Sequence, residues 1–267
     1  MSTTDPVNEF ATGARRLAYL RDLLYELVLR DVKLRYKRSV LGVGWSLLAA
    51  LAQLLILQLV FTRVVPLNIP HYTTFLFAGL LPWTWFQSSL LLATGATLDN
   101  RELVRLVRFP VWILPVITVT SQFIHLLLAL PLLLLFLWID HSPLSITLVA
   151  LPLVFGVQFL LTVSCAYFVA PLQALFHDTE HLLGILLTLC FYLTPVFYTL
   201  DRVPPWRRHW LDVNPFVHLL EAYRRILLQG AWPAFFPLLV LAAISAVLLA
   251  LGYRFYVRLH YRFAQEL

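Results

Sequence analysis

The sequence predicts an all-α polytopic membrane protein. Of its 267 residues, 60% are hydrophobic and only 13% are charged, and the mean hydropathy is +0.80. Residues 39–61 contain no charged side chain. At ~1.5 Å per residue, a helix of that length crosses the hydrocarbon core of a bilayer. A soluble domain of this size would carry far more charge.

The basic character of the chain does not indicate nucleic-acid binding. Net charge is +6, but the basic residues gather at the ends of apolar runs, where membrane topology and anionic headgroups explain them. Cys165 and Cys190 lie inside apolar runs and are interpreted as small hydrophobic residues. Residues 1–38 hold no apolar core of a cleavable signal peptide.

An amphipathic helix is expected within residues 15–38. Its leucines recur at three- and four-residue steps, and charged residues fill the other faces. We expect it to lie in the membrane interface, although a soluble helix packed on a partner fits the same periodicity. The leucines of the stripe are Leu17, Leu20, Leu24, Leu27 and Leu34.

Six apolar runs follow, each long enough to span a bilayer. They form one transmembrane domain over 39–256, between a cytoplasmic N-terminal segment (1–38) and a cytoplasmic tail (257–267). Prolines within the runs predict kinks in the helices. Neighbouring groups can bind the carbonyl groups that each proline leaves without a hydrogen-bond partner. The runs are 39–62, 72–97, 110–138, 144–170, 182–200 and 233–255.

The distribution of lysine and arginine predicts the orientation. With six spans, 14 of the 20 basic residues fall on the side of the two termini, so both termini are expected in the cytoplasm. The fifth loop departs from this trend, because it carries five arginines on the opposite side.

That fifth loop, 201–231, is expected to hold a re-entrant or interfacial helix. Asn214-Pro215 is a strong helix start, and Gly230 a stop. Glu221 precedes Arg224 and Arg225 by three and four residues, which favours a local ion pair. One apolar stripe runs along this helix and contains Phe216, Leu219, Leu220, Tyr223 and Leu227.

The second loop is expected to form a short cytoplasmic helix within 99–109. Asp99 or Asn100 can cap it, and Phe109-Pro110 ends it. A small apolar patch on this helix contains Leu103, Val104 and Val107. The patch fits a docking surface for a partner, and it equally fits a helix that lies in the membrane interface where the chain turns back.

Several kinds of chemistry are absent. The only lysines, Lys33 and Lys37, do not follow a glycine, so the chain has no phosphate-binding loop. His125 is the only readily ionisable group near the centre of a span, which weighs against an ion-coupled transporter. We therefore expect no cofactor in this chain.

Residues 177–181 contain possible metal ligands but are not interpreted as a metal site. His177 and His181 would share a face of a helix, with Asp178 and Glu180 beside them. The start of the fifth span explains these residues better, because Asp178 or Thr179 can cap it and acidic groups favour a helix N-terminus.

Aromatic residues gather near the ends of the spans. An interfacial belt accounts for most of them. The sharper hypothesis is a path for a glycan, because aromatic faces stack on sugar rings. The candidates for that path are Trp45, Tyr72, Trp83, Trp85, Phe86, Tyr192, Phe197 and Tyr198.

Five motifs, in order, resemble the permeases of ABC transporters that export polysaccharides. They are Arg35-Tyr36-Lys37-x-Ser39-x-Leu41-Gly42-x-x-Trp45, Phe75-x-Phe77-x-Gly79-Leu80-Leu81-Pro82-Trp83, Asn100-x-x-Leu103-Val104 running to Phe109-Pro110, Leu193-Thr194-Pro195-Val196-Phe197-Tyr198, and Asn214-Pro215 with Glu221 and Arg224. The resemblance extends from about residue 20 to residue 256. The chain departs from it in the fourth loop, where the family has Arg-Asp and this chain has His177-Asp178.

The resemblance implies a permease in the bacterial inner membrane. Two copies would form a channel, and two copies of a separate ATPase would dock beneath and bind ATP and magnesium. The cargo would be a polyprenyl-pyrophosphate-linked glycan of the O-antigen, capsule or teichoic acid type. A drug exporter of the same architecture and a membrane enzyme acting on lipid-linked sugars remain the alternatives.

The resemblance also implies roles for particular residues. Arg35, Tyr36, Lys37 and Arg38 would meet the pyrophosphate, although topology alone explains them equally well. Asn214, Glu221 and Arg224 would form an outer gate. The surface that couples to the ATPase would include Asn100, Leu103, Val104, Arg105, Arg108 and Asp178.

Overall fold

The computed structural model describes residues 13–35, 39, 44–64, 66–104, 109–143 and 145–266, all of whose regular elements are helical. The prediction of an all-α chain is therefore confirmed for these residues. The elements are α1 (Gly13–Arg35), α2 (Gly44–Leu59), η2 (Val60–Val64), α3 (Tyr72–Gly95), α4 (Arg101–Val104), α5 (Ile113–Ile139), η3 (Ile146–Ala150), α6 (Leu151–Leu175), α7 (Thr179–Leu193), η4 (Leu200–Arg202), α8 (Pro205–Asp212), α9 (Pro215–Leu227) and α10 (Phe235–Glu266).

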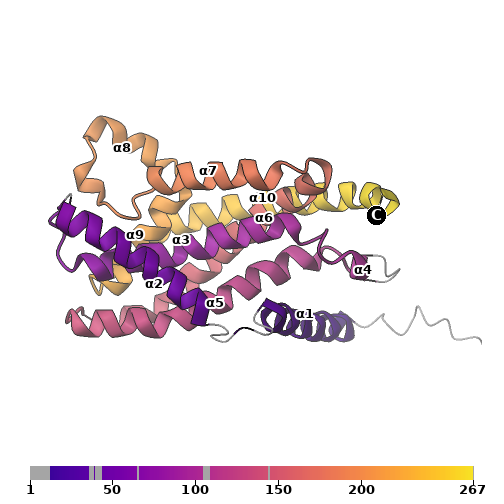
Figure 1. Cartoon of the computed structure of the whole chain (residues 1–267), viewed down its shortest axis with the longest axis horizontal. Coiled ribbons are helices and arrows are strands. Elements are labelled where there is room, and N and C mark those ends of the chain that lie inside the picture. Colours follow the sequence, from indigo (N-terminus) through magenta and orange to yellow (C-terminus); the bar gives the residue numbers. More distant parts are fainter. Residues whose placement is uncertain are drawn as a thin grey trace, which may run out of the picture.

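The long helices run side by side and give the bundle two distinct ends (Figure 1). The short helix α4, the helix α1 and the C-terminal end of α10 lie toward one end, at the right of Figure 1. We call it the α1 end. Helix α8 lies at the opposite end, which we call the α8 end.

Among the described residues, four helices are long and apolar enough to cross a membrane. They are Tyr72–Gly95, Ile113–Ile139, Ile146–Leu175 and the Phe235–Leu259 part of α10. They agree with the predicted runs 72–97, 110–138, 144–170 and 233–255. Helix α10 continues to Glu266, so the predicted tail 257–267 is largely an extension of this helix.

The other two predicted spans are shorter than expected. The predicted run 182–200 corresponds to α7, whose 15 residues cover only ~22 Å, because Thr194 is already extended and Pro195 follows it. The predicted run 39–62 corresponds to α2, where the apolar helix among the described residues is Leu48–Val64 and its last turn is the π-helical η2. Its first residues, 40–43, lie outside the described residues.

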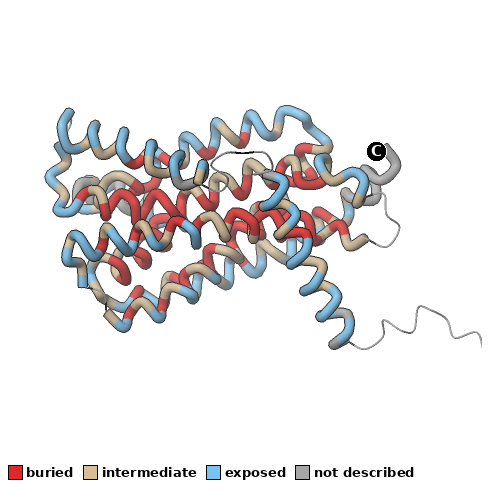
Figure 2. Tube along the Cα trace, turned by 60° about the horizontal axis from the view of Figure 1, so that its bottom comes forward, coloured by how far each residue is buried: buried red, intermediate tan, exposed pale blue. Residues whose placement is uncertain are grey.

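Helices α3 and α6 form the centre of the bundle. Helix α3 packs against α2, α5, α6, α7 and α9, and most of its side chains are buried. Figure 2 shows buried residues concentrated on the inner helices, whereas the peripheral helices expose one face. An exposed apolar face is what a membrane helix presents to lipid or to another subunit.

A buried polar link joins three of these helices. Gln158 on α6 donates from Nε2 to the carbonyl oxygen of Pro82 on α3, at 2.8 Å. Its Oε1 accepts a hydrogen bond from the Tyr223 hydroxyl on α9, also at 2.8 Å. The side chain of Gln158 is thereby paired on both sides, so a polar residue can lie inside an apolar core.

Helices α6 and α10 approach each other closely. The Ser164 hydroxyl donates to the carbonyl oxygen of Ser245 at 2.8 Å. A Cβ at Gly252 would lie 3.0 Å from the Phe168 ring and 3.1 Å from the Ser164 carbonyl oxygen. Small residues at such contacts let membrane helices pack backbone to backbone.

Helix α1 occupies the region in which an amphipathic interface helix was predicted. It packs against α5 and buries Leu27 and Val28, with Leu20 and Leu24 partly buried beside them. The two ends of the predicted stripe are exposed, Leu17 by 70% and Leu34 by 56%. Helix α1 therefore presents apolar side chains outward as well as toward α5.

Helix α9 matches the prediction made from its start and stop signals. The Asn214 side chain accepts a hydrogen bond from the Phe216 backbone N–H at 3.0 Å, with Pro215 in the first turn. After the helix, Gly230 adopts a positive φ of 58°, which favours glycine. All five residues of the predicted apolar stripe are buried.

Candidate functional site

Side chains from two helices hold the backbone that follows α7. Helix α7 ends at Leu193, and the segment 194–197 leaves it in a non-helical conformation. No helical turn follows whose backbone N–H groups could bind its carbonyl groups, so these carbonyl groups need other hydrogen-bond donors. They receive donors from α3 and α9, so this segment, called here the 194–197 segment, is fixed to the core.

Arg224 of α9 supplies two of these donors. Its Nη1 donates to the Pro195 carbonyl oxygen at 2.7 Å and its Nη2 to the Val196 carbonyl oxygen at 2.6 Å. The guanidinium lies 3.7 Å from the centre of the Phe75 ring of α3, a cation–π contact. Its buried Nε finds no hydrogen-bond partner among the described residues. The planar guanidinium group can donate to two neighbouring carbonyl groups at the same time.

Of the two arginines that the spacing offered to Glu221, Arg224 binds the 194–197 segment instead. Glu221 pairs instead with Arg225, at 2.9 Å, on the partly exposed side of α9. The i,i+4 spacing allows that pair, whereas the side chain three residues on turns toward the core. In the predicted group, Asn214 and Arg224 thus make part-buried contacts with the 194–197 segment, whereas Glu221 forms a pair nearer the surface.

Two more hydrogen bonds complete the hold on the 194–197 segment. Asn214 donates from Nδ2 to the Thr194 hydroxyl at 2.9 Å. The Tyr72 hydroxyl at the start of α3 donates to the Phe197 carbonyl oxygen at 3.0 Å. All four residues of the segment are thereby held by side chains of α3, of α9 or of Asn214, which caps α9.

Gly79 makes room for this arrangement. A Cβ at Gly79 would lie 2.9 Å from Arg224 Nη2 and 3.1 Å from the Val196 carbonyl oxygen. Contacts this short are not tolerated without displacement of one partner. The glycine within Phe75-x-Phe77-x-Gly79 is thus explained by the close approach of the arginine and the 194–197 segment.

Three neighbouring members of the predicted aromatic path, all on α3, lie in the core of the chain. Trp83, Trp85 and Phe86 are buried. Trp83 and Phe86 contact Phe216 of α9, with ring centroids 5.1 and 4.4 Å apart. The Trp85 indole N–H donates to the Val119 carbonyl oxygen. These contacts pack the helices together within this chain.

Other predicted aromatics gather near the 194–197 segment. Phe197 stacks on Phe61 of η2 with centroids 5.1 Å apart, and Tyr72 lies beside Phe61. Tyr192 and Tyr198 line an open hollow of about 580 Å³ together with Trp206 and Trp210 of α8. Trp45 on α2 is 56% exposed and stands apart from these groups.

Helix α4 lies at the α1 end, where the coupling surface was predicted. Within the described residues, Leu103 is partly buried and Val104 buried, while Arg101 and Glu102 are exposed. The apolar patch therefore turns toward the core, and the charged residues face outward. Asn100 accepts a hydrogen bond from Arg30 of α1 and donates to the Ala96 carbonyl oxygen. Arg105 and Arg108 lie outside the described residues.

The turn between α6 and α7 also lies at the α1 end. Gln173 of α6 donates from Nε2 to the His177 carbonyl oxygen at 2.9 Å and accepts the Glu180 backbone N–H on Oε1 at 2.8 Å. Asp178 precedes α7 and is exposed, but its side chain makes no capping hydrogen bond. The side chain that caps α7 is thus Gln173, from the preceding helix.

No group of three or more histidine, cysteine or acidic side chains suited to a metal ion occurs in the part of the chain that the structure describes, which includes 177–181. The residues expected to meet a pyrophosphate lie outside it. Tyr36, Lys37 and Arg38 are not described, and of Arg35 only the backbone is, at the end of α1.

Sequence reasoning missed the contacts that matter most at the α8 end. Arg224 follows Leu220 by four residues and therefore falls near the buried stripe of α9, a signal that it points inward. The carbonyl partners of Tyr72 and the two-sided pairing of Gln158 carry no comparable signal, because they join residues 125 and 65 positions apart.

Comparison with known proteins gives a family and several relatives. The profile of the family described as ABC-2 type transporter matches residues 22–228. The O-antigen export system permease protein RfbA of Myxococcus xanthus is 37% identical over 237 residues, which cover 88% of this chain and 91% of that protein.

Two further relatives are also aligned over most of their length. A protein of the same name from Klebsiella pneumoniae is 30% identical over 252 residues, 94% of this chain and 97% of that protein. The polysialic acid transport protein KpsM of Escherichia coli is 26% identical over 235 residues, 86% of this chain and 90% of that protein.

Proposed function

Because the chain belongs to the ABC-2 type transporter family, we propose that it is the permease subunit of an ATP-driven polysaccharide exporter. Its cargo is a polyprenyl-pyrophosphate-linked glycan of the O-antigen, capsule or teichoic acid type, carried outward from the cytoplasmic side of the bacterial inner membrane. The observation that carries this proposal is the 37% identity to an O-antigen export permease over 91% of that protein.

The physical features of the chain agree with a permease. It is a multi-pass membrane protein with several apolar helices, and its sequence contains no phosphate-binding loop. Hydrolysis of ATP, with magnesium, therefore belongs to a separate ATPase subunit. We propose that two copies of this chain assemble with two copies of that ATPase.

We propose six membrane crossings with both termini in the cytoplasm. The basic residues of α1 and of the C-terminal part of α10 lie toward one end of the bundle, which supports that orientation. In this arrangement each of the short helices α2 and α7 crosses the membrane together with the segment that continues it. The α1 end then faces the ATPase, and α4 and the α6–α7 turn meet it.

The outer roles follow from the same orientation. Helices α8 and α9 then lie on the far side of the membrane, and Asn214 and Arg224 fix the 194–197 segment at the exit of the path. Arg35, Tyr36, Lys37 and Arg38 meet the pyrophosphate at the cytoplasmic mouth, where charge-assisted hydrogen bonds favour it. Trp45 and Tyr192 are the most exposed of the predicted aromatics, and Tyr198 lines the open hollow beside α8.

A genetic experiment tests the proposal. The gene is deleted in its host, and export of surface glycan is followed with a glycan-specific antibody on intact cells. The proposal predicts that deletion abolishes surface glycan and leaves lipid-linked glycan inside the cell. Reintroduction of the wild-type gene restores export.

Two controls separate this function from its alternatives. A partner ATPase that lacks its phosphate-loop lysine must block export equally, because the permease alone has no energy source. Loss of resistance to a small toxic compound, with surface glycan unchanged, would favour a drug exporter instead. Accumulation of an unmodified lipid-linked sugar would favour a membrane enzyme.

A further inference from the structure

A cavity of about 300 Å³ lies between α2, α3 and α5. Its volume falls at the lower end of the roughly 300–1,000 Å³ that small-molecule pockets occupy. None of the side chains that hold the 194–197 segment lines it. The polar residues of its lining are Gln53, Thr84, Gln87, Ser88, Gln122 and His125.

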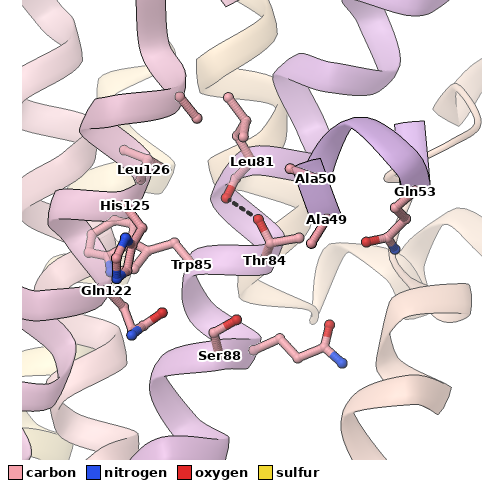
Figure 3. A pocket seen from close by; sticks show the side chains of 12 residues that line it. Ala49, Ala50, Gln53, Leu81, Thr84, Trp85, Ser88, Gln122, His125 and Leu126 are labelled. Atoms are coloured by element: carbon pink, nitrogen blue, oxygen red, sulfur yellow. Dashed lines mark hydrogen bonds between the residues drawn. The ribbon is translucent and has the colours of Figure 1, made fainter. Parts of the chain in front are cut away.

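These polar residues lie at the middle of their helices. Gln53 is near the centre of Gly44–Val64, Thr84 and Ser88 are central in α3, and Gln122 and His125 approach the centre of α5. Figure 3 shows Gln53 on α2 opposite Gln122 and His125 on α5, with Thr84 and Ser88 of α3 between them. Polar side chains at this depth in a membrane are unfavourable unless they serve a function.

The cavity offers a hydrogen-bonding group that the described part of the chain does not use. Gln122 Nε2 is buried and has no hydrogen-bond partner among the described residues. Gln53 and Ser88 also line the cavity and are partly exposed. Buried polar groups are almost always paired, so the Gln122 amide is a donor that a ligand in the cavity could use.

The lining provides both hydrogen-bond donors and acceptors. Among the described residues that line the cavity there is no aspartate, glutamate, lysine or arginine. Amides and hydroxyls donate and accept, as sugar hydroxyls do. A phosphate would call for cationic side chains, and an acyl chain would leave the amides unpaired. The chemistry of the lining thus fits a neutral, hydroxyl-rich ligand.

We propose that this cavity binds a neutral sugar unit of the exported glycan through its hydroxyl groups. The inference rests on the proposed function and adds to it a binding site at the middle of the membrane. Helix α2 forms the wall that admits the glycan. It packs on α3 and α5 and buries, among its described residues, only Leu54.

Site-specific cross-linking tests this placement directly. A photoreactive benzoylphenylalanine replaces Gln53, inside the cavity, in cells that are exporting glycan, and adducts are detected with a glycan-specific antibody. The matched control replaces Leu55, which is 60% exposed and points away from Gln53 on the same helix. We expect a glycan adduct at position 53 and none at position 55.

Each other outcome overturns the site. An adduct at position 53 with a second copy of the permease would show that a helix fills the cavity in the assembly. An adduct at position 55 alone would place the glycan on the other face of α2. No adduct at either position, in cells whose wild-type chain exports glycan, would reject the cavity and leave the proposed function intact.

A substitution gives an independent measurement. In Gln122→Leu the unpaired amide is replaced by an apolar group of similar size. Because no internal hydrogen bond is lost, thermal stability in detergent should stay equal or rise. Export should nevertheless fall about threefold to tenfold, the effect of one lost ligand hydrogen bond. Normal export by this variant would contradict the proposal, whereas absence of export by the wild type would contradict the proposed function itself.

Discussion

Arg224 Nη2 lies 2.6 Å from the carbonyl oxygen of Val196, so a side chain of α9 caps the backbone that follows α7. The second terminal nitrogen binds the Pro195 carbonyl oxygen, and Phe75 covers the guanidinium. An arginine stays protonated in proteins, and these partners compensate the buried charge. Helix α9 is therefore joined to α7 and α3 by one side chain.

Substitution of Arg224 should destabilise the protein strongly. Arg224→Leu removes two charge-assisted hydrogen bonds and leaves two carbonyl oxygens unpaired, which should lower the free energy of unfolding by roughly 3 kcal/mol. Arg224→Lys should recover only part of that loss, because an ammonium group cannot match two carbonyls as a planar fork does. Thermal unfolding of the purified protein in detergent measures both effects.

Arg225 provides the matched control on the same helix. Its ion pair with Glu221 is partly exposed. Such pairs contribute about 0.2–1 kcal/mol, so Arg225→Leu should change stability little. Equal effects of the two substitutions would contradict the assignment of Arg224 as the residue that holds the 194–197 segment.

Gly79→Ala should disturb the same contact from the other side. The added methyl group would meet Arg224 Nη2 at 2.9 Å and the Val196 carbonyl oxygen at 3.1 Å. Overpacking of this kind costs about 1–3 kcal/mol. Gly156→Ala on α6 is the control, because nothing lies within 4 Å of its Cβ position. Since alanine favours a helix, that variant should be neutral or slightly stabilised, and a loss in it comparable to that of Gly79→Ala would count against steric crowding.

The Gln158 link makes a prediction for a pair of substitutions. Gln158→Leu leaves the Tyr223 hydroxyl and the Pro82 carbonyl oxygen unpaired, so we expect a loss of about 2–4 kcal/mol. Tyr223→Phe removes one partner only and should cost less. In the double variant the two effects should not add, because both act on one hydrogen bond. Additive losses would show that the two side chains act independently.

The capping of α7 by Gln173 can be tested at the α1 end. Gln173→Leu removes both hydrogen bonds that tie α6 to the start of α7, and should cost about 1–2 kcal/mol. If this turn meets the ATPase, the variant should also export less glycan for each ATP hydrolysed. His181→Ala, at an exposed position in the same region, is the control and should leave both quantities unchanged.

Local signals in the sequence predicted local structure well. Asn214-Pro215 predicted the start of α9, and the stripe from Phe216 to Leu227 predicted its buried face, because both depend on neighbours along the helix. The lengths of the helices were less predictable. The run 182–200 contains no charged residue, yet α7 ends at Leu193, since Pro195 and the donors of α3 and α9 stabilise a non-helical backbone there.

Contacts between residues that are far apart along the chain could not be predicted from the sequence. Glu221 was paired with either arginine by spacing alone, and only the packing of α9 on α3 decides that Arg224 turns inward and Arg225 outward. Likewise, the polar residues of the cavity come from three helices. Gln53, Thr84 and Gln122 belong to separate predicted spans, and only the fold brings them together.

Reconstitution tests the central claim most directly. The purified permease and its ATPase partner are placed in proteoliposomes whose outer leaflet receives lipid-linked glycan, with ATP and magnesium on the side of the ATPase. The account predicts that glycan becomes protected from an added glycosidase only when ATP, the ATPase and this permease are all present. Protection without the ATPase, or ATP hydrolysis by the assembled complex with the glycan still fully accessible, would contradict it.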